Sequence, residues 1–104
     1  MIKVSIMYAN EVGACFDHDY YRETHMPMVK RLLGDACLRY SIDRGIAGGA
    51  PDAPAPYIGV GHLYCDSVRA FEVAFAPHAR TVMTDLKNYT NLSPIVQVSE
   101  IVVD

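Results

Sequence analysis

The sequence lacks the features that mark membrane-spanning, secreted and nucleic-acid-binding proteins. No apolar run among its 104 residues approaches the roughly 20 that a membrane-spanning helix needs. The N-terminal segment MIKVSIMY does not have the pattern of a signal peptide. Nine Lys and Arg residues against twelve Asp and Glu residues give a net charge of −3, which provides no basic surface for nucleic acid. We therefore expect a cytoplasmic protein that binds neither membranes nor nucleic acid.

Cysteines are few, and their spacing excludes the usual cysteine sites. Cys15, Cys37 and Cys65 are odd in number and form no CxxC or Cys/His ligand pattern, so neither a zinc site nor a disulfide framework is expected. Separated thiols of this kind are typical of ordinary apolar residues in a reducing compartment. The glycine-rich segment at 45–50, GIAGGA, has the wrong spacing for a dinucleotide fingerprint. We expect no metal and no cofactor.

The composition predicts one globular domain over residues 1–104. Hydrophobic residues make up 51% of the chain and charged residues 20%, a balance without a disordered tail. A domain of this size buries a modest fraction of its surface, so association with a second copy would stabilise it. We expect a homo-oligomer.

A helix is predicted over residues 17–33, with the sequence DHDYYRETHMPMVKRLL. The carboxylate of Asp17 can accept hydrogen bonds from the free amides of a first helical turn, and Gly34 is a preferred residue for ending a helix. The residues that share one face of this helix recur at i, i+4, i+7, i+8 and i+11: Tyr21, His25, Met28, Val29 and Leu32. His25 is therefore expected to face the interior.

Pro27 interrupts this helix two residues after His25. Proline removes an amide donor, clashes with the carbonyl four residues back, and costs about 3 kcal/mol in a helix interior. The sequence therefore predicts a kink or a short break beside His25. Two interpretations stay open: His25 is a core histidine and Pro27 starts a second helical segment, or the bend holds the imidazole at the wall of a pocket.

The remaining patterns complete an α+β fold. Period-two alternation or apolar runs predict strands at residues 2–8, 37–47, 57–65 and 95–103. A second helix is predicted to begin at Asp66 or Ser67 and to reach Leu86, with Pro77 as an interruption. The order strand, helix, strand, strand, helix, strand is ferredoxin-like, βαββαβ. It predicts a four-stranded antiparallel sheet with both helices on one face.

Two features of the predicted sheet indicate that it packs against a second copy of the chain. Helices on one side leave Ile58, Val60 and Tyr64 on an uncovered face, and the strand at 95–103 is apolar on both sides. Sheet-to-sheet packing about a two-fold axis would bury this face, so we expect a homodimer in the form of a dimeric α/β barrel, with His62 as a structural residue of the interface.

The segment GGAPDAPAP at 48–56 is either a tolerated surface insertion or a flap that covers a pocket.

Glycines in the third strand predict a cavity. Gly59 and Gly61 alternate with bulky residues on the face that meets the helices, where a missing side chain leaves room. Either a cavity lies there or helix residues such as Phe71 and Phe75 fill the gap. The residues expected to wall the cavity are Tyr8, Tyr40 and Leu63 from the sheet, and Tyr21, His25 and Phe75 from the helices.

The run DYYRETHMPMV at 19–29, the later YIGVGHLYCDSVRAFEVAFAPHA at 57–79, and the chain length resemble the EthD family of the dimeric α/β-barrel superfamily. The resemblance covers nearly the whole chain and implies the same fold and face-to-face dimer. The family is named for a component associated with breakdown of an alkyl ether, and its members are often labelled reductases without a defined reaction.

More distant relatives include cofactor-free lactone isomerases, polyketide cyclases and quinone-forming monooxygenases. In the methylmuconolactone isomerase branch, a helix histidine and a second-strand tyrosine line the pocket, and the matching positions are His25 and Tyr40. The resemblance thus implies that His25 and Tyr40 are catalytic. From the predicted cavity wall, we expect Tyr8, Tyr21, Leu63 and Phe75 to bind substrate. That branch has a cysteine where this chain has Leu63, so part of its chemistry is missing here.

The groups of His25 and Tyr40 suit proton transfer. An imidazole with an ordinary pKa near 6.5 accepts a proton at neutral pH, and an apolar wall keeps it neutral. A tyrosine hydroxyl can donate to a developing enolate oxygen. We expect a cofactor-independent enzyme of isomerase, cyclase or oxidoreductase type that acts in catabolism on a small hydrophobic or aromatic carbonyl compound. The alternatives are a non-catalytic accessory protein that binds a hydrophobic metabolite and, third, a haem protein, for which no residue stands out as axial ligand.

Overall fold

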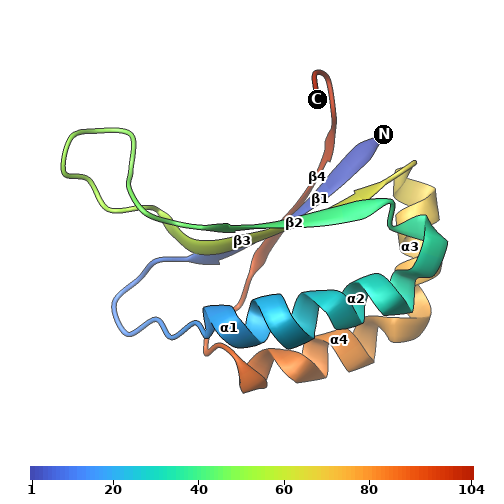
Figure 1. The fold of residues 1–104 in the computed structure, drawn as a ribbon, viewed down its shortest axis with the longest axis horizontal. Coiled ribbons are helices and arrows are strands. Elements are labelled where there is room, and N and C mark those ends of the chain that lie inside the picture. Colours follow the sequence, from blue (N-terminus) through green and yellow to red (C-terminus); the bar gives the residue numbers. More distant parts are fainter.

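The structure is a computed structural model that describes residues 1–104. Four antiparallel strands form one sheet in the order β2-β3-β1-β4, and the helices lie together on one face of it (Figure 1). The strands are β1 (Ile2–Ala9), β2 (Arg39–Arg44), β3 (Tyr57–Cys65) and β4 (Ile95–Glu100). This order confirms the ferredoxin-like prediction. The single sheet is open rather than closed into a barrel.

Strands β2 and β4 are shorter than predicted. The chain reaches β2 through a 3-10 turn over Gly34–Ala36, so Cys37 bonds back to the carbonyl of Gly34 at 3.2 Å instead of joining the strand. At the other end of the sheet, Glu100 pairs with Ile2, the first residue of β1. The amide of Ile101 then bonds to the carbonyl of Met1 at 3.1 Å, but no further ladder pair follows, and β4 ends at Glu100.

The first helical segment begins and ends where the sequence predicted. Asp17 is its N-cap, and its Oδ1 accepts a hydrogen bond from the amide of Tyr20 at 3.0 Å. The segment ends at Gly34, which has a φ of 59° that favours glycine. Its parts are α1 (His18–Tyr20), a π-helical turn η1 (Tyr21–His25) and α2 (Met26–Leu33).

The predicted interruption at Pro27 is a π-helical turn, not a break. The amide of Met26 donates to the carbonyl of Tyr21, five residues back. Pro27 has no amide hydrogen, so the α-helical ladder lacks one donor at this point, and a wider turn accommodates the gap. Tyr21 and His25 both remain buried on the inner side of this turn.

The second helical segment is also interrupted, at Pro77. Ser67 is its N-cap and accepts from the amide of Ala70 at 3.0 Å, which confirms one of the two predicted starts. Its parts are α3 (Val68–Phe75), a 3-10 turn η3 (Ala76–His78), α4 (Ala79–Asp85) and a 3-10 turn η4 (Leu86–Asn88). None of the helices has the length and apolar character that crossing a membrane requires.

The hydrophobic core fills the space between the sheet and the helices. Its largest fully buried side chains are Tyr8, Tyr21 and Met26. Cys37 and Cys65 are buried free thiols, as expected of apolar residues. Cys15 differs, because it is a free thiol exposed on the loop before α1.

The face of the sheet that carries no helix, hereafter the open face, is less apolar than predicted. Apolar residues lie toward one end of it, among them Met7, Val60 and Ile95, which register places on one side of their strands. A polar row crosses its centre: the Ser5 hydroxyl lies 2.8 Å from His62 Nδ1, and His62 Nε2 lies 3.0 Å from the Asp43 carboxylate. The polar atoms of this row are therefore paired within the subunit.

Candidate functional site

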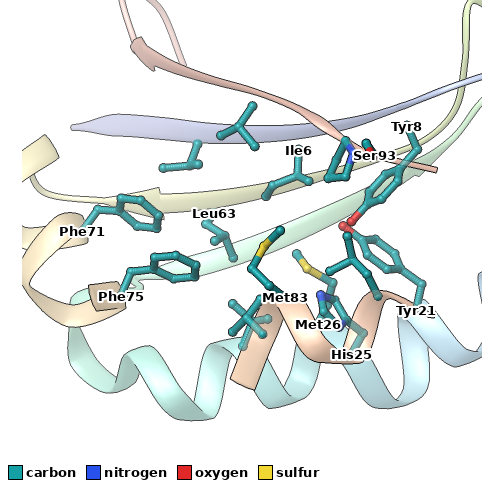
Figure 2. A pocket seen from close by; sticks show the side chains of 16 residues that line it. Ile6, Tyr8, Tyr21, His25, Met26, Leu63, Phe71, Phe75, Met83 and Ser93 are labelled. Atoms are coloured by element: carbon teal, nitrogen blue, oxygen red, sulfur yellow. The ribbon is translucent and has the colours of Figure 1, made fainter. Parts of the chain in front are cut away.

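A cavity of about 340 Å³ lies between the sheet and the helices (Figure 2). This volume is at the lower end of the range for small-molecule sites. Thirteen of its 16 lining residues are hydrophobic, and none is Lys or Arg. The wall contains Val4 and Ile6 of β1, Leu63 of β3 and Val96 of β4. A cavity between the two layers, as the sequence predicted, is present.

Most of the residues predicted to form the site lie around this cavity, and one does not. The lining includes Tyr8, Tyr21, His25, Leu63 and Phe75. Tyr40 lies outside the lining. It pairs with Leu63 on the same side of the sheet, but β2 is an edge strand and the cavity extends from β3 toward β4. Tyr40 instead packs, half-buried, against the core, so the expected pair of His25 and Tyr40 does not form.

The glycines of β3 make room for aromatic side chains rather than for the cavity itself. A Cβ atom on Gly61 would overlap the hydroxyl of Tyr21, and one on Gly59 would lie 3.0 Å from the ring of Phe16. The cavity continues beyond them, toward Phe71 and Phe75. These two rings stack with centroids 5.3 Å apart and line the wall instead of filling the gap (Figure 2).

A partly buried carboxylate holds one nitrogen of His25. Nδ1 of His25 lies 2.8 Å from Oδ2 of Asp85, whose side chain is 14% exposed. The other oxygen, Oδ1, accepts hydrogen bonds from the Tyr20 hydroxyl at 2.7 Å and from the Asn88 amide at 2.9 Å. Asp85 therefore joins the π turn to the end of the second helical segment and fixes the imidazole in place.

The other nitrogen of His25 meets a chain of tyrosines. Nε2 lies 3.3 Å from the hydroxyl of Tyr89, and that hydroxyl lies 2.7 Å from the hydroxyl of Tyr8. Tyr8 lines the cavity and Tyr89 does not. Figure 2 shows the hydroxyl ends of Tyr8 and Tyr21 pointing toward one another at the wall. The polar end of the cavity thus consists of tyrosine hydroxyls, with His25 next to them.

The electrostatics of this cluster favour a neutral imidazole beside a carboxylate. Burial lowers the pKa of His25 from its ordinary value, and this outweighs the opposite effect of Asp85. Burial would raise the pKa of Asp85, but hydrogen bonds from Tyr20, His25 and Asn88 bring it below its usual value. At neutral pH, Asp85 is therefore ionised and His25 is neutral.

Burial also raises the pKa of the tyrosines that surround His25. The effect applies to Tyr8, Tyr21 and Tyr89, whose rings pack against one another. All three therefore stay neutral at physiological pH. A neutral hydroxyl can both donate and accept a hydrogen bond, so these groups can pass a proton along a chain.

Sequence reasoning missed Asp85 and Tyr89, although a signal for both is present. Val82 and Leu86 belong to the inward stripe of the second helix, and the same period reaches Tyr89. Asp85 falls on this stripe three residues after Val82. A carboxylate among inward apolar residues must find a partner, and His25 is that partner.

Other candidate features lie away from the cavity. The lining includes neither His62, nor His78, nor any residue of the segment 48–56. That segment belongs to an arm that projects past the sheet (Figure 1), so within one subunit it does not cover the cavity. The cavity wall reaches the surface at Met83 and Val96, which are 55% and 57% exposed. No group of three or more His, Cys, Asp or Glu residues is placed to hold a metal ion.

The family model described as the EthD domain matches residues 14–93. The chain belongs to the EthD family. The crystal structure of an EthD-like protein from Ralstonia eutropha JMP134 is similar to this EthD protein, with a TM-score of 0.95 and 44% sequence identity. That match covers 99% of this chain and 93% of the other.

Two further structures share the fold of this EthD protein at low sequence identity. An ethyl tert-butyl ether D (EthD) family protein from Bacillus halodurans C-125 matches with a TM-score of 0.71 and 17% identity, over 96% of this chain and 97% of that one. HapK from Hahella chejuensis matches with a TM-score of 0.56 and 13% identity, over 100% and 96%. Comparison with curated proteins found no match.

Proposed function

We propose that this EthD protein is a cofactor-independent enzyme that transfers a proton on a small, neutral, hydrophobic compound, with an aromatic or cyclic carbonyl compound as the substrate class. The reaction would be an isomerisation, a cyclisation or a step of an oxidation in catabolism, in the cytoplasm. One observation carries the proposal: a single imidazole, held by the partly buried carboxylate of Asp85, lies in the wall of a largely apolar cavity.

The residues of the site provide what such a proton transfer needs. A neutral His25 can accept a proton, and Asp85 stabilises the imidazolium that results. The lining contains no Lys or Arg that would neutralise a carboxylate or a phosphate on the ligand, so a neutral compound suits it. The name of the Bacillus halodurans relative refers to ethyl tert-butyl ether, which is also small, neutral and hydrophobic.

Deuterium exchange into 2-tetralone, a neutral aromatic ketone with acidic C–H bonds, tests this proposal. NMR of the ketone in D₂O measures the exchange rate with and without the protein. We expect His25→Gln to lower the protein-catalysed rate by about 100-fold, because general base catalysis contributes at least that much. His78→Gln is the matched control, since His78 does not line the cavity. Equal rates for wild type and His25→Gln would refute the role of His25.

A non-catalytic binding protein is the second candidate. Its support is that both nitrogens of His25 already have protein partners, so the imidazole has a structural role without any ligand. In this case 2-tetralone would bind to the wild type and to His25→Gln with equal affinity in a titration of tyrosine fluorescence. Binding would be unchanged between pH 5 and pH 8, and no deuterium would enter the ketone.

We also propose that a second copy of the chain covers the open face. The apolar end of that face, which includes Met7, Val60 and Ile95, supports this assignment, because a partner would remove it from water. A two-fold axis gives each subunit the same contact and closes the assembly. The helices and the cavity of each subunit would then lie on the outside of the dimer.

A further inference from the structure

We infer that the proton reaches His25 through the hydroxyls of Tyr8 and Tyr89, and that Asp85 fixes the imidazole at the end of this relay. The relay consists of Tyr8, Tyr89, His25 and Asp85, in the order of their hydrogen bonds from Tyr8 on the cavity wall to Asp85. This inference rests on the proposed function, because it assigns a route to the proton whose transfer is proposed above. It makes Tyr8 the group that a bound compound contacts, and Tyr89 a residue that acts without touching it.

The hydrogen bonds of His25 are the first step of the argument. Nδ1 lies 2.8 Å from the Asp85 carboxylate and Nε2 lies 3.3 Å from the Tyr89 hydroxyl. A compound in the cavity therefore finds no ring nitrogen that is free of a protein partner. The nearest polar group with access to the cavity along the same chain is the Tyr8 hydroxyl, 2.7 Å from that of Tyr89.

The direction of each hydrogen bond follows from the neutral state of the imidazole. The ionised carboxylate of Asp85 can only accept, so Nδ1 carries the proton of His25 and Nε2 is an acceptor. Tyr89 must donate its one hydroxyl proton to Nε2, and it therefore accepts from Tyr8. The three hydrogen bonds all point from Tyr8 toward Asp85. One lone pair of the Tyr8 oxygen faces the Tyr21 hydroxyl, which also lines the cavity, and the other is left to accept a proton from a compound there.

The protons along this route balance, and no other reactant is needed. When the compound releases a proton to the Tyr8 oxygen, the proton of Tyr8 moves to Tyr89 and that of Tyr89 moves to Nε2. Each tyrosine gives one proton and takes one, so both end neutral. The compound becomes an enolate or phenolate, and His25 becomes an imidazolium beside Asp85. Reversal of the route returns a proton to the compound at the same or another atom.

The surroundings of the relay favour a concerted transfer. Burial disfavours a phenolate on Tyr8 or Tyr89, so the protons move together rather than one at a time. Asp85 is the charged group that contacts His25, and Tyr20 and Asn88 both donate to its other oxygen, Oδ1. The ring of Tyr21 stacks on His25 with an angle of 14° between the planes. Burial lowers the pKa of the imidazole and Asp85 raises it, and burial has the larger effect.

The tautomer of His25 tests the relay without any ligand. Two-bond ¹⁵N–¹H correlation spectra of the ¹⁵N-labelled protein at pH 7.5 distinguish the two neutral tautomers. We expect the Nδ1–H form in the wild type. Asp85→Asn should shift His25 to the Nε2–H form, because the side-chain amide of asparagine can donate to Nδ1. An Nε2–H tautomer in the wild type would overturn the relay, since Tyr89 would then accept from His25.

The exchange of deuterium into 2-tetralone tests the route itself. We expect Tyr89→Phe to lower the rate at saturating ketone by about 100-fold. Its KM should stay unchanged, because Tyr89 does not line the cavity. Tyr8→Phe should lower the saturated rate equally, since it removes the first oxygen of the relay. Tyr57→Phe is the matched control, because Tyr57 lies at the start of β3, outside the lining.

The two proposals fail in different ways. If Tyr89→Phe retains the full rate while His25→Gln loses it, the compound reaches His25 directly and the relay is wrong, although the proposed function stands. If the wild type catalyses no exchange although His25 has the Nδ1–H tautomer, the proposed function fails, and the proton route fails with it.

Discussion

Among single residues, His25 combines deep burial with a neutral side chain. Only 3% of the residue is exposed, so a charged imidazole would lose its hydration. The carboxylate of Asp85 does not compensate fully, since the pKa of His25 stays below its ordinary value. The ring therefore offers Nε2 as a hydrogen-bond acceptor at neutral pH. This is the protonation state that a general base needs before a reaction begins.

The lowered pKa of His25 predicts a loss of stability in mild acid. The unfolded chain binds a proton on this histidine near pH 6.5, whereas the folded protein binds it only at lower pH. The stabilisation is fully present above pH 6.5 and is lost as the pH falls toward the folded pKa. Urea unfolding between pH 8 and pH 5 should show the free energy of unfolding falling with acidification. Asp85, whose pKa is also lowered, adds a second loss below pH 4.

Removal of the imidazole supplies the control for this pH dependence. His25→Gln cannot titrate, so its free energy of unfolding should fall less steeply over the same range. His18, whose pKa is also lowered by burial, contributes a term of the same sign in both proteins. Identical slopes for wild type and His25→Gln would contradict the burial argument.

The sequence predicts which face His25 presents but not what it contacts. Its inward position follows from the spacing of one helical stripe, which is local information. Its partner Asp85 lies 60 residues away, and their contact depends on how two helices pack. Tyr40 shows the same limit, because its side of the strand is predictable but its distance from the cavity depends on the strand order.

At the scale of elements, the π turn and strand β3 are fitted to each other. The π turn places Tyr21 and His25 on one side with their rings stacked, 5.4 Å between centroids. The ring of Tyr21 reaches the sheet opposite Gly61, where a side chain would overlap it. Pro27 and Gly61 thus act together, because one widens the helix and the other lets its tyrosine approach the strand.

This fit predicts that Gly61→Ala destabilises the protein, against the usual trend. Glycine inside a strand costs roughly 0.5–1 kcal/mol relative to alanine, so the change would otherwise stabilise. The new Cβ would instead overlap the hydroxyl of Tyr21, and overpacking of this kind costs about 1–3 kcal/mol. The free energy of unfolding in urea should therefore fall. Gly49→Ala is the matched control, since nothing lies within 4 Å of its added Cβ.

A double substitution identifies the cause of that loss. Gly61→Ala should cost less in a Tyr21→Phe background, because phenylalanine lacks the oxygen that the Cβ would meet. The cost of Gly61→Ala would not vanish in that background, since the Met26 side chain also lies 3.2 Å from the added Cβ. An equal cost in both backgrounds would show that strand conformation, not the tyrosine, requires Gly61.

The positions where the helices and strands begin and end show which boundaries the local sequence determines. The caps at Asp17 and Ser67 and the stop at Gly34 are local hydrogen-bonding and backbone preferences, and all three hold. The end of β4 at Glu100 is not local, because it depends on pairing with β1, and the last such pair joins Glu100 to Ile2. The apolar residues that follow Glu100 predicted a longer strand, but they form no ladder pair with β1.

In the whole molecule, the two faces of the sheet have different chemistry. One face meets the helices and the cavity, while the open face carries apolar residues beside the polar row of Ser5, His62 and Asp43. Buried polar groups are costly when they lack partners. The row is hydrogen-bonded within the subunit, so a partner that covered it would leave His62 paired on both nitrogens. Burial of this face in a dimer is therefore compatible with its polar residues.

The assembly can be tested with matched valine substitutions. We expect light scattering after size exclusion to give the wild type a mass of twice 11.5 kDa. Val60→Lys should give a folded monomer, because it places a charge on the open face while Asp43, its cross-strand neighbour, can pair with it in the free subunit. Val73→Lys should remain a dimer, since Val73 is 63% exposed on α3. A wild-type monomer would refute the dimer, and a dimer that Val60→Lys leaves intact would place the contact on another face.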